Sequence, residues 1–288
     1  KQRVPIVIKA DGLAAGKGSI IAASREEAVH ALRQIMQDRV FGAAGDRVVI
    51  EEYLSGKEVS LVAVTDGTTV APFMPACDYK KAGDNDTGLN TGGMGAYCPP
   101  GFFARADIGR ATGAILEPTV RALAAEGIVF HGVLYAGLMV SPDGIRTLEF
   151  NARFGDPETQ VTLPLLKSDI VEVFLAAIEG RLDKLRIDWY DSACVGVVIA
   201  SAGYPGDYRT GFPIAGLDNL DRDVLVFHAG TRLGEDGKSV HTGGGRVLNV
   251  VATGKTLAEA REKVYSNIGR ISFEGAYYRR DIAAREVC

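Results

Sequence analysis

The 288-residue sequence predicts an α+β fold, because strand patterns, helical patterns and glycine-rich loops alternate along the chain. Strand-like runs at residues 58–65 and 69–74 are joined by Asp66-Gly67, a dipeptide typical of tight hairpins. Of the 35 glycines, 11 form clusters in three loops, at residues 12–18, 83–95 and 243–245. The glycine excess therefore marks particular loops, and it does not indicate a low-complexity chain.

The first elements are a strand, a loop and a second strand. A β-branched run at 4–9 is followed by the loop DGLAAGKG and a run at 19–22. Ser24 and Glu27 form a capping box that predicts a helix over 25–38, and a strand follows at 48–53.

The middle of the chain is expected to alternate loop, helix and hairpin. Residues 77–100, rich in Gly, Asp, Asn and Pro, are expected to form one long loop, and connections of this length are usually functional. A helix over 104–126 should end at Gly127. Strands at 132–140 and 146–151 flank a Pro-Asp-Gly turn.

The last part is expected to contain a helix at 169–179 and apolar strands at 194–200, 224–228 and 247–252. Thr256 and Glu259 form a second capping box, which opens a helix to about residue 270. The predicted division is residues 1–66, 67–191 and 192–288.

Composition excludes several classes of protein. The formal net charge of -4 gives no electrostatic footprint for nucleic acid or an anionic membrane, and the longest apolar runs are too short to cross a bilayer. We therefore expect a soluble, cytoplasmic protein. Four scattered cysteines without a CxxC pair indicate a reducing compartment and argue against a disulfide scaffold or a zinc site.

The first glycine loop carries Lys9 at the end of its leading strand and Lys17 inside it, with Gly16 and Gly18 on either side. Backbone N–H groups and two cations suit a polyphosphate. The loop lacks the P-loop and Rossmann patterns. A plain hairpin tip with solvated lysines is the alternative, and the loop alone does not decide between them.

Two further constellations carry carboxylates. Glu51 lies at a strand end and Glu58 opens the next strand, where they could bind adenine and ribose hydroxyls, or could simply be charged strand ends. In LEFNARFGDPE, strand alternation places Glu149 and Asn151 on one face, about 6.6 Å apart along the chain, as suits Mg²⁺ shared with phosphate oxygens. Arg153 follows on the same alternation. A polar strand face is the alternative here.

The order KADGLAAGKG, EEYLSGKE and LEFNARFGDPE resembles the ATP-grasp superfamily. DYKKAGDNDTGLNTGGMGAYCPP and NARFGDPETQ closely resemble the phosphoribosylamine-glycine ligase family of purine biosynthesis, and the resemblance covers essentially the whole chain. It implies an ATP-grasp fold, with a small lid subdomain and a central antiparallel-sheet subdomain, followed by a small C-terminal α/β domain. The family's N-terminal domain has no counterpart in this sequence, and the chain starts at Lys1, so we expect it to be a fragment.

The resemblance also implies a reaction and its participants. ATP and glycine form glycyl phosphate, the amine of 5-phosphoribosylamine displaces phosphate, and Mg²⁺ or Mn²⁺ assists. No nucleic acid or membrane partner is expected, and the protein should be a monomer or a loose dimer. Another ATP-grasp carboxylate-amine ligase or carboxylase, or a non-catalytic nucleotide-binding module, are the alternatives.

The roles that the resemblance implies divide by ligand. The resemblance implies that the phosphates are bound by Lys9, Gly16, Lys17 and Gly18, and the adenine by Glu51 and the Leu54 backbone. It implies that Glu58 binds the ribose and that Glu149 and Asn151 bind the metal. Asp86 is expected to bind the ammonium of glycine and Arg153 its carboxylate, with Lys80 also catalytic. The loop residues Asn90, Thr91, Gly92 and Gly93 are expected to supply backbone donors to bound ligand.

Three positions depart from the patterns that the resemblance implies. Tyr79 and Leu89 stand where the family usually has His and Pro. Many ATP-grasp enzymes carry a further metal carboxylate about 12 residues before Glu149, and here that position is Gly137. We therefore expect only two protein ligands to the metal.

Overall fold

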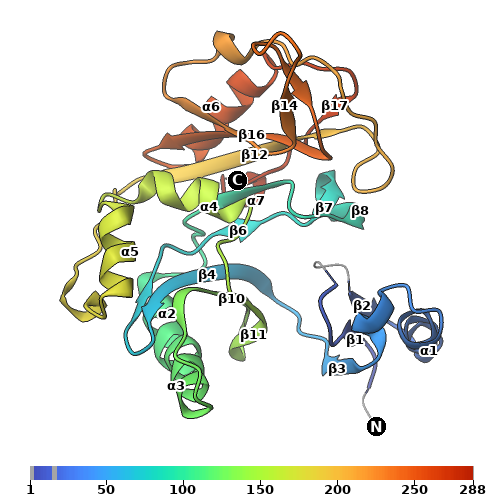
Figure 1. Ribbon diagram of the computed structural model, residues 1–288, viewed down its shortest axis with the longest axis vertical. Helices are drawn as coiled ribbons and strands as arrows, with labels where there is room; N and C mark the ends of the chain where they lie inside the picture. The colour runs from blue at the N-terminus through green and yellow to red at the C-terminus, as the bar shows by residue number, and fades with distance from the viewer. Residues whose placement is uncertain (1–2, 15–17, 288) are drawn as a thin grey trace. The chain divides into compact units, whose positions relative to one another are not determined.

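The computed structural model describes residues 3–14 and 18–287. Contacts divide the chain into two compact units, Lys1–Gly56 and Lys57–Cys288 (Figure 1). The first unit has one sheet and the second has several, and each unit has its own buried core.

The first unit is a three-stranded antiparallel sheet covered by one helix. The strands run in the order β2 (Ser19–Ala22), β1 (Ile6–Ala10) and β3 (Val48–Glu52). Helix α1 (Arg25–Leu32) continues as a π-helical turn, Arg33–Gln37, which confirms the predicted helix. In the described part of the unit, the core consists of Ile8, Ala22, Ala28, Ala31 and Ile35.

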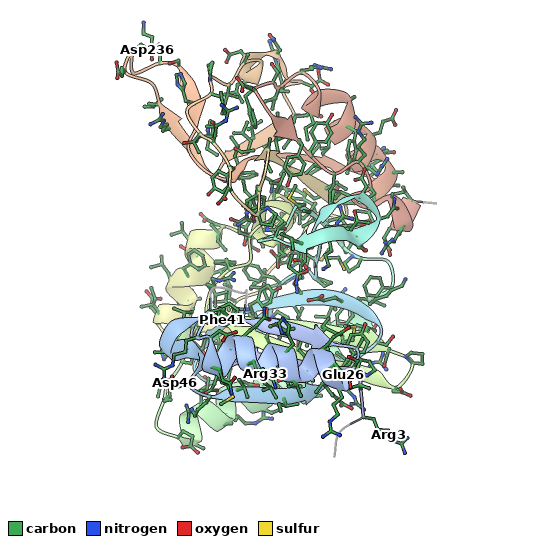
Figure 2. The ribbon with its side chains drawn as sticks, turned by 90° about the vertical axis from the view of Figure 1, so that its right-hand side faces the viewer. Arg3, Glu26, Arg33, Phe41, Asp46 and Asp236 are labelled. Atoms are coloured by element: carbon green, nitrogen blue, oxygen red, sulfur yellow. The ribbon has the colours of Figure 1, made fainter. Side chains whose placement is uncertain are left out.

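Ser24 caps α1 as predicted, because its Oγ accepts a hydrogen bond from the Glu27 N–H at 3.1 Å. The reciprocal bond differs from the predicted capping box, since the Glu27 carboxylate accepts from the N–H of Ala23, at 2.7 Å, and not from that of Ser24. Figure 2 shows Glu26 and Arg33 along this helix, and Phe41 and Asp46 in the segment that follows. Both Glu26 and Arg33 are exposed, so this helix buries only its opposite, alanine-rich side.

The second unit contains a four-stranded antiparallel sheet. Its order is β11 (Gly144–Asn151), β10 (His131–Ser141), β4 (Lys57–Asp66) and β5 (Val70–Pro72). The predicted turn between β4 and β5 is confirmed, because Gly67 has φ +88° and the Asp66 carboxylate accepts from the N–H groups of Thr68 and Thr69.

Helices cover both faces of this sheet. The helix expected over 104–126 is present as α2 (Arg105–Ala111), a π-helical turn and α3 (Glu117–Ala125), and Gly127 follows it with φ +81°. Leu116 and Val120 pack with Leu61 of β4. Helix α5 (Ile170–Ile178) packs against Val64, which points to the opposite face.

A second sheet of this unit joins distant parts of the chain. Its strands run in the order β13 (Val224–His228), β16 (Arg246–Gly254), β12 (Ala193–Ser201), β9 (Gly95–Cys98) and β6 (Cys77–Asp78), and β17 (Ala276–Tyr277) also pairs with β12. Helix α6 (Leu257–Ile268), capped by Thr256 as predicted, covers one face. Helix α4 (Glu158–Thr162) covers the other (Figure 1).

The segment 77–100, expected to be one loop, is instead partly strand. Besides β6 and β9 it forms a small hairpin of β7 (Lys81–Gly83) and β8 (Thr87–Asn90). The expectation was wrong because these strands have two to four residues, and β9 exists by pairing with β12, about 100 residues away along the chain. Such pairing leaves no periodic signal in the sequence.

The second unit also contains the short elements β14 (Thr231–Leu233), β15 (Val240–Thr242) and α7 (Ala284–Val287), and 3-10 turns at Asp84–Asp86, Leu163–Leu165, Leu182–Lys184 and Leu217–Asn219. Among residues 3–14 and 18–287, no helix has the length and apolar character required to cross a membrane. Cys77, Cys98 and Cys194 are buried free thiols.

Candidate active site

In the first unit, two of the proposed ATP ligands contact each other. Lys9 lies near the end of β1 and Glu51 near the end of β3, and their side chains form an ion pair with Nζ and Oε2 2.6 Å apart. The β1–β3 register places Val7 opposite Glu51, so Lys9 and Glu51 lie diagonally on one face of the sheet. A nucleotide bound here would meet an ammonium and a carboxylate already held together.

The glycine loop of the first unit is only partly described. Gly16 and Lys17 lie outside the described residues. Gly18 is buried and its carbonyl accepts from the Ala10 N–H at 2.8 Å, while a Cβ at this position would lie 2.6 Å from that of Ala14. Leu54 follows β3 and is half-buried.

In the second unit, Glu58 of β4 and Lys80, in the turn after β6, form an ion pair. The carbonyl of Lys80 also accepts from both the N–H and the Oγ1 of Thr91, at 2.7 and 2.9 Å. Burial alone would lower the pKa of Lys80, but the negative charges of Asp78 and Glu58 outweigh burial and raise its pKa. Lys80 therefore stays a fixed cation among carboxylates.

Asp78 lies two residues before Lys80, at the end of β6. Burial raises the pKa of its carboxyl to about 7; the positive charge of Lys80 opposes the shift, while Glu158 and Glu58 add to it. The carboxyl thus changes charge near neutral pH, beside a lysine that does not.

Glu158 is a buried carboxylate that the sequence analysis did not single out. It accepts hydrogen bonds from Tyr135 Oη at 2.8 Å and Ser60 Oγ at 3.2 Å. Burial and the charge of Glu158 raise the pKa of Tyr135. The signal was available, since Glu158 lies inside NARFGDPETQ, and Gly155 of the same motif leaves the space that the Glu158 carboxyl fills.

Glu149 and Asn151 share one face of β11, as the alternation predicted, because Asn151 Nδ2 donates to Glu149 Oε1 at 3.3 Å. A carboxylate and an amide oxygen are ligands that Mg²⁺ and Mn²⁺ accept, so the donor set fits a divalent cation. Gly137 lies opposite Glu149 on β10, and a Cβ there would lie 3.2 Å from Glu149 Cγ. A larger side chain at position 137 would crowd this carboxylate.

Within the ranges that the structure describes, no cluster of three or more His, Cys, Asp or Glu side chains could hold a metal alone. A cation at Glu149 and Asn151 would need further ligands, which phosphate oxygens and water can supply.

Arg153 is exposed just beyond β11, and its guanidinium donates to the Phe154 carbonyl at 2.8 Å. Asp86 lies elsewhere in the second unit and has two guanidinium partners, Arg279 at 3.0 Å and Arg285 at 2.8 Å. No hydrogen bond or ion pair of the described residues joins Asp86 to Arg153. An ammonium at Asp86 would either share the carboxylate with these two guanidinium groups or replace one of them, and that of Arg285, about two-thirds exposed, is the more accessible.

The expected donors at 90–93 already have partners inside the protein. The Thr91 N–H donates to Lys80, the Gly92 N–H to Tyr204 Oη at 2.9 Å, and the Gly93 N–H to Thr91 Oγ1 at 3.0 Å. Asn90 is the last residue of β8 and pairs with Lys81. These N–H groups would have to exchange partners to bind a phosphate.

Gly93 itself is required by the backbone. Its φ is +111°, and a Cβ would overlap the Pro157 ring. The turn 90–93 and the segment that follows Arg153 therefore pack against each other so closely that only glycine fits.

Tyr79 has a structural contact that accounts for the residue present. Its ring lies beneath the Arg279 guanidinium, 4.7 Å from centroid to Cζ, and its hydroxyl accepts from the Ala283 N–H at 3.0 Å. The triple glycine, whose role the sequence left open, packs against aromatic rings, since a Cβ on Gly245 would overlap Tyr204.

Two family models match the chain. The model of the phosphoribosylglycinamide synthetase ATP-grasp (A) domain matches residues 1–159, more than half of the sequence, and that of the phosphoribosylglycinamide synthetase C domain matches residues 194–285. The chain belongs to the phosphoribosylglycinamide synthetase family. The resemblance seen in the motifs is thereby confirmed.

Similar proteins extend beyond this chain. A phosphoribosylamine-glycine ligase of Halalkalibacterium halodurans is 51% identical over 284 residues, which are 99% of this chain and 65% of that protein. One of Caldanaerobacter subterraneus is 52% identical, over 97% of this chain and 66% of its own length. The chain thus spans about two thirds of these relatives. In the trifunctional purine biosynthetic protein adenosine-3 of Gallus gallus, 50% identity covers 98% of this chain and 28% of that protein.

Solved structures show the same fold. The phosphoribosylamine-glycine ligase of Thermotoga maritima matches with a TM-score of 0.88 and 37% identity, over 97% of this chain and 69% of that one. The biotin carboxylase domain of the Hydrogenobacter thermophilus 2-oxoglutarate carboxylase matches with a TM-score of 0.68 and 15% identity, over 96% and 59%. Family members and this more distant neighbour together confirm the predicted ATP-grasp fold.

Proposed function

We propose that the protein to which this sequence belongs ligates glycine to 5-phosphoribosylamine at the expense of ATP, in purine biosynthesis. The observation that carries the proposal is the connected site of the second unit. There Glu58 and Lys80 form an ion pair. The charges of Lys80, Glu158 and Glu58 act on the pKa of Asp78, and the charges of Asp78, Glu58 and Glu149 raise the pKa of Lys80. The relatives' printed name, phosphoribosylamine-glycine ligase, supplies the two substrates.

The chemistry needs positioning and charge neutralisation more than a protein nucleophile. A carboxylate oxygen of glycine attacks the γ-phosphorus of ATP, ADP leaves, and glycyl phosphate forms. The amine nitrogen of phosphoribosylamine then attacks the acyl carbon and loses a proton, and inorganic phosphate leaves. Both steps gather negative charge on phosphate oxygens, which a fixed cation such as Lys80 stabilises.

The proposed roles follow the ligands. Lys9, with Gly16, Lys17 and Gly18, would face the phosphates, Glu51 and the Leu54 backbone the adenine, and Glu58 the ribose. Arg153 and Asp86 would bind the carboxylate and ammonium of glycine, the latter after Arg285 moves away, and Asn90, Thr91, Gly92 and Gly93 would offer their backbone groups after exchanging partners. Mg²⁺ or Mn²⁺ held by Glu149 and Asn151 would neutralise phosphate oxygens.

Three finer points belong to the same proposal. We retain the division at residues 1–66, 67–191 and 192–288 as functional parts of the chain. A cytoplasmic location is supported by the free thiols of Cys77, Cys98 and Cys194. A monomer or loose dimer is proposed, without nucleic acid or membrane as partner.

The test is substrate dependence of ADP release by the full-length gene product. ADP should form rapidly only when ATP, glycine and phosphoribosylamine are all present, and little should form when either glycine or phosphoribosylamine is omitted. Faster ADP release with bicarbonate or another amino acid would assign the protein to a different ATP-grasp reaction. Nucleotide binding without turnover under every condition would favour a non-catalytic module.

A further inference from the structure

Arginines from late in the sequence contact the segment 78–93, which we call the substrate loop because it carries Lys80 and Asp86, one of the two residues proposed to bind glycine. Arg285 pairs with Asp86 and is about two-thirds exposed, while Arg279 and Arg246 are more buried. Arg279 has a guanidinium that is completely buried. It donates to the carbonyl of Lys81 at 2.9 Å, to Asp86 at 3.0 Å and to Asp281 at 2.6 and 2.8 Å.

Neighbouring residues reinforce this contact. The Arg280 N–H donates to Asp84 at 2.7 Å, and the Asn85 N–H donates to Asp281 at 2.9 Å. Asn85 and Asp86 both have a backbone φ of +55°, a conformation that residues other than glycine rarely adopt unless surrounding contacts stabilise it. The buried Arg279 and its neighbours supply that support at the near end of the loop.

Arg246, at the start of β16, contacts the other end. Its Nη1 donates to the carbonyl of Gly92 at 2.8 Å and of Asp156 at 3.0 Å, and its two terminal nitrogens pair with the Asp156 carboxylate at 3.1 and 3.2 Å. One guanidinium thus joins the turn 90–93 to the segment that follows Arg153. The fork geometry of arginine makes this three-way contact possible.

We propose that Arg279 and Arg246 are positioning residues for catalysis, which hold the two ends of the substrate loop so that Lys80 stays beside Glu58. The inference rests on the proposed function and deepens it. Both arginines lie within residues 194–285, the C domain. The C domain therefore completes the catalytic site of the ATP-grasp part through two side chains that touch the loop, and neither of them needs to touch substrate.

Each of the carbonyl groups of the substrate loop that these arginines hold is linked to the backbone of Lys80. Arg279 binds the carbonyl of Lys81, the next residue, while Thr91, next to the carbonyl held by Arg246, bonds twice to the carbonyl of Lys80. A shift at either end of the loop would therefore move the Lys80 backbone. The Glu58–Lys80 ion pair would report that movement.

The experiment compares three glutamine variants of the full-length gene product: Arg279→Gln, Arg246→Gln and, as the matched control, Arg209→Gln. Arg209 pairs with Glu274 at 3.0 Å, but it is about four-fifths exposed and lies outside the loop contacts. Glutamine can still donate hydrogen bonds, but it lacks the charged, forked guanidinium group. Unlike lysine, it adds no further Nζ signal to the NMR spectrum. Two readouts are needed: steady-state kinetics, and the nitrogen NMR signal of Lys80 Nζ, assigned with Lys80→Arg.

We expect kcat to fall at least tenfold in Arg279→Gln and Arg246→Gln, with the dissociation constant of ATP changed less than twofold and the Lys80 signal shifted. Arg209→Gln should match the wild type in all three. A fall in kcat with an unmoved Lys80 signal would show a merely structural role and overturn the proposal. So would a moved signal with unchanged kcat, or no change in either.

Arg279→Gln leaves Asp86 and Asp281 without their buried partner, and it could fail to fold. Arg246, about one-fifth exposed, then decides the proposal by the same criteria. The NMR readout does not depend on the identity of the substrates. If the wild type releases no ADP with ATP, glycine and phosphoribosylamine, the proposed function fails. If the wild type is active but the Lys80 Nζ signal is not shifted in the arginine variants, only the positioning role is overturned.

Discussion

The two units hold their candidate site residues in different ways. In residues 1–56 the small core of Ile8, Ala22, Ala28, Ala31 and Ile35 supports a sheet on which Lys9 and Glu51 pair at a partly exposed surface. In residues 57–288 several clusters of buried side chains surround two sheets, and candidate residues are tied by contacts between distant segments. The larger buried clusters of the second unit fix the positions of its side chains, whereas the small core of the first unit gives less resistance to local unfolding.

The difference suggests a division of labour. Few buried contacts correspond to low local stability, so backbone amides of the first unit should exchange with solvent faster than those of β4, β10 and β12. The proposed nucleotide-binding surface of the first unit can tolerate such opening, because closure on a ligand commonly accompanies catalysis. In the proposed reaction, Lys80, Glu149 and Arg153 have to keep their positions through both chemical steps.

The largest effect is expected for Glu149→Ala in the second unit. Removing this carboxylate should lower metal-dependent ATP turnover by about a thousandfold or more, because one of two proposed protein ligands is lost. The fold should remain, since β11 stays paired along β10. ADP release over a Mg²⁺ titration measures the effect, and an unchanged metal dependence would refute the assignment.

Arg153→Lys should have the next largest effect on activity. The substitution keeps the charge but loses the fork, so turnover with glycine should fall about a hundredfold while ATP affinity changes little. Asp86→Asn is the comparison, and it should mainly raise the KM for glycine, because the ammonium takes no part in bond changes. Wild-type glycine kinetics in both variants would remove these residues from the site.

Gly93→Ala tests how rigidly the second unit is packed. A side chain at φ +111° that overlaps Pro157 should lower the free energy of unfolding by about 3 kcal/mol. Gly109→Ala is the matched control, because nothing lies within 4 Å of a Cβ there and alanine should stabilise α2 by about 0.5 to 1 kcal/mol. Urea unfolding distinguishes the two, and equal stabilities would contradict the close packing of the turn.

Asp78→Asn should change how stability depends on pH. The carboxyl has its pKa raised from 3.8 to about 7 in the folded protein, so the folded state binds more protons between these values and Asp78 makes stability fall as pH rises through that range. Relative to the wild type, Asp78→Asn should therefore gain on the order of 2 kcal/mol between about pH 5 and pH 7. The free energy of unfolding of both proteins is measured by urea unfolding across this pH range. A difference between wild type and variant that does not change with pH would place the pKa of Asp78 near its ordinary value.

The smallest of the five effects is expected in the first unit. Lys9→Met should weaken ATP binding about tenfold through one charge-assisted contact. It should leave the stability of residues 57–288 unchanged. Calorimetric titration of ATP gives the affinity, with Arg39→Met, which breaks the exposed Arg39–Asp46 pair of the same unit, as control. Equal affinities in both variants would remove Lys9 from the phosphate site.

The sequence predicted correctly those features that depend on residues close together along the chain, such as helix ends and the alternation of side chains in a strand. The capping residues Ser24 and Thr256 open helices, Gly127 ends one, and alternation placed Glu149 and Asn151 on a common face. These features depend on residues two to four positions apart, which is the range over which periodicity and capping act.

Features made by distant segments could not be predicted in the same way. Strands β6 and β9 are short, and β9 pairs with β12 while β6 pairs with β9. The contacts of Asp86 with Arg279 and of Gly92 with Arg246 join residues more than 150 positions apart. The sequence indicated that residues 78–93 carry function, but the partners that hold them became visible only in three dimensions. Glu158 was missed because a glutamate at the start of a helix is usually exposed.

The most direct test of the proposed function follows an oxygen atom. Glycine labelled with oxygen-18 in its carboxylate is incubated with ATP, phosphoribosylamine and the full-length gene product, and the inorganic phosphate is analysed by mass spectrometry. If a glycine carboxylate oxygen attacks the γ-phosphorus and then leaves with phosphate, each phosphate released should carry one labelled oxygen. Product formation with unlabelled phosphate would contradict the glycyl phosphate route and with it the central claim.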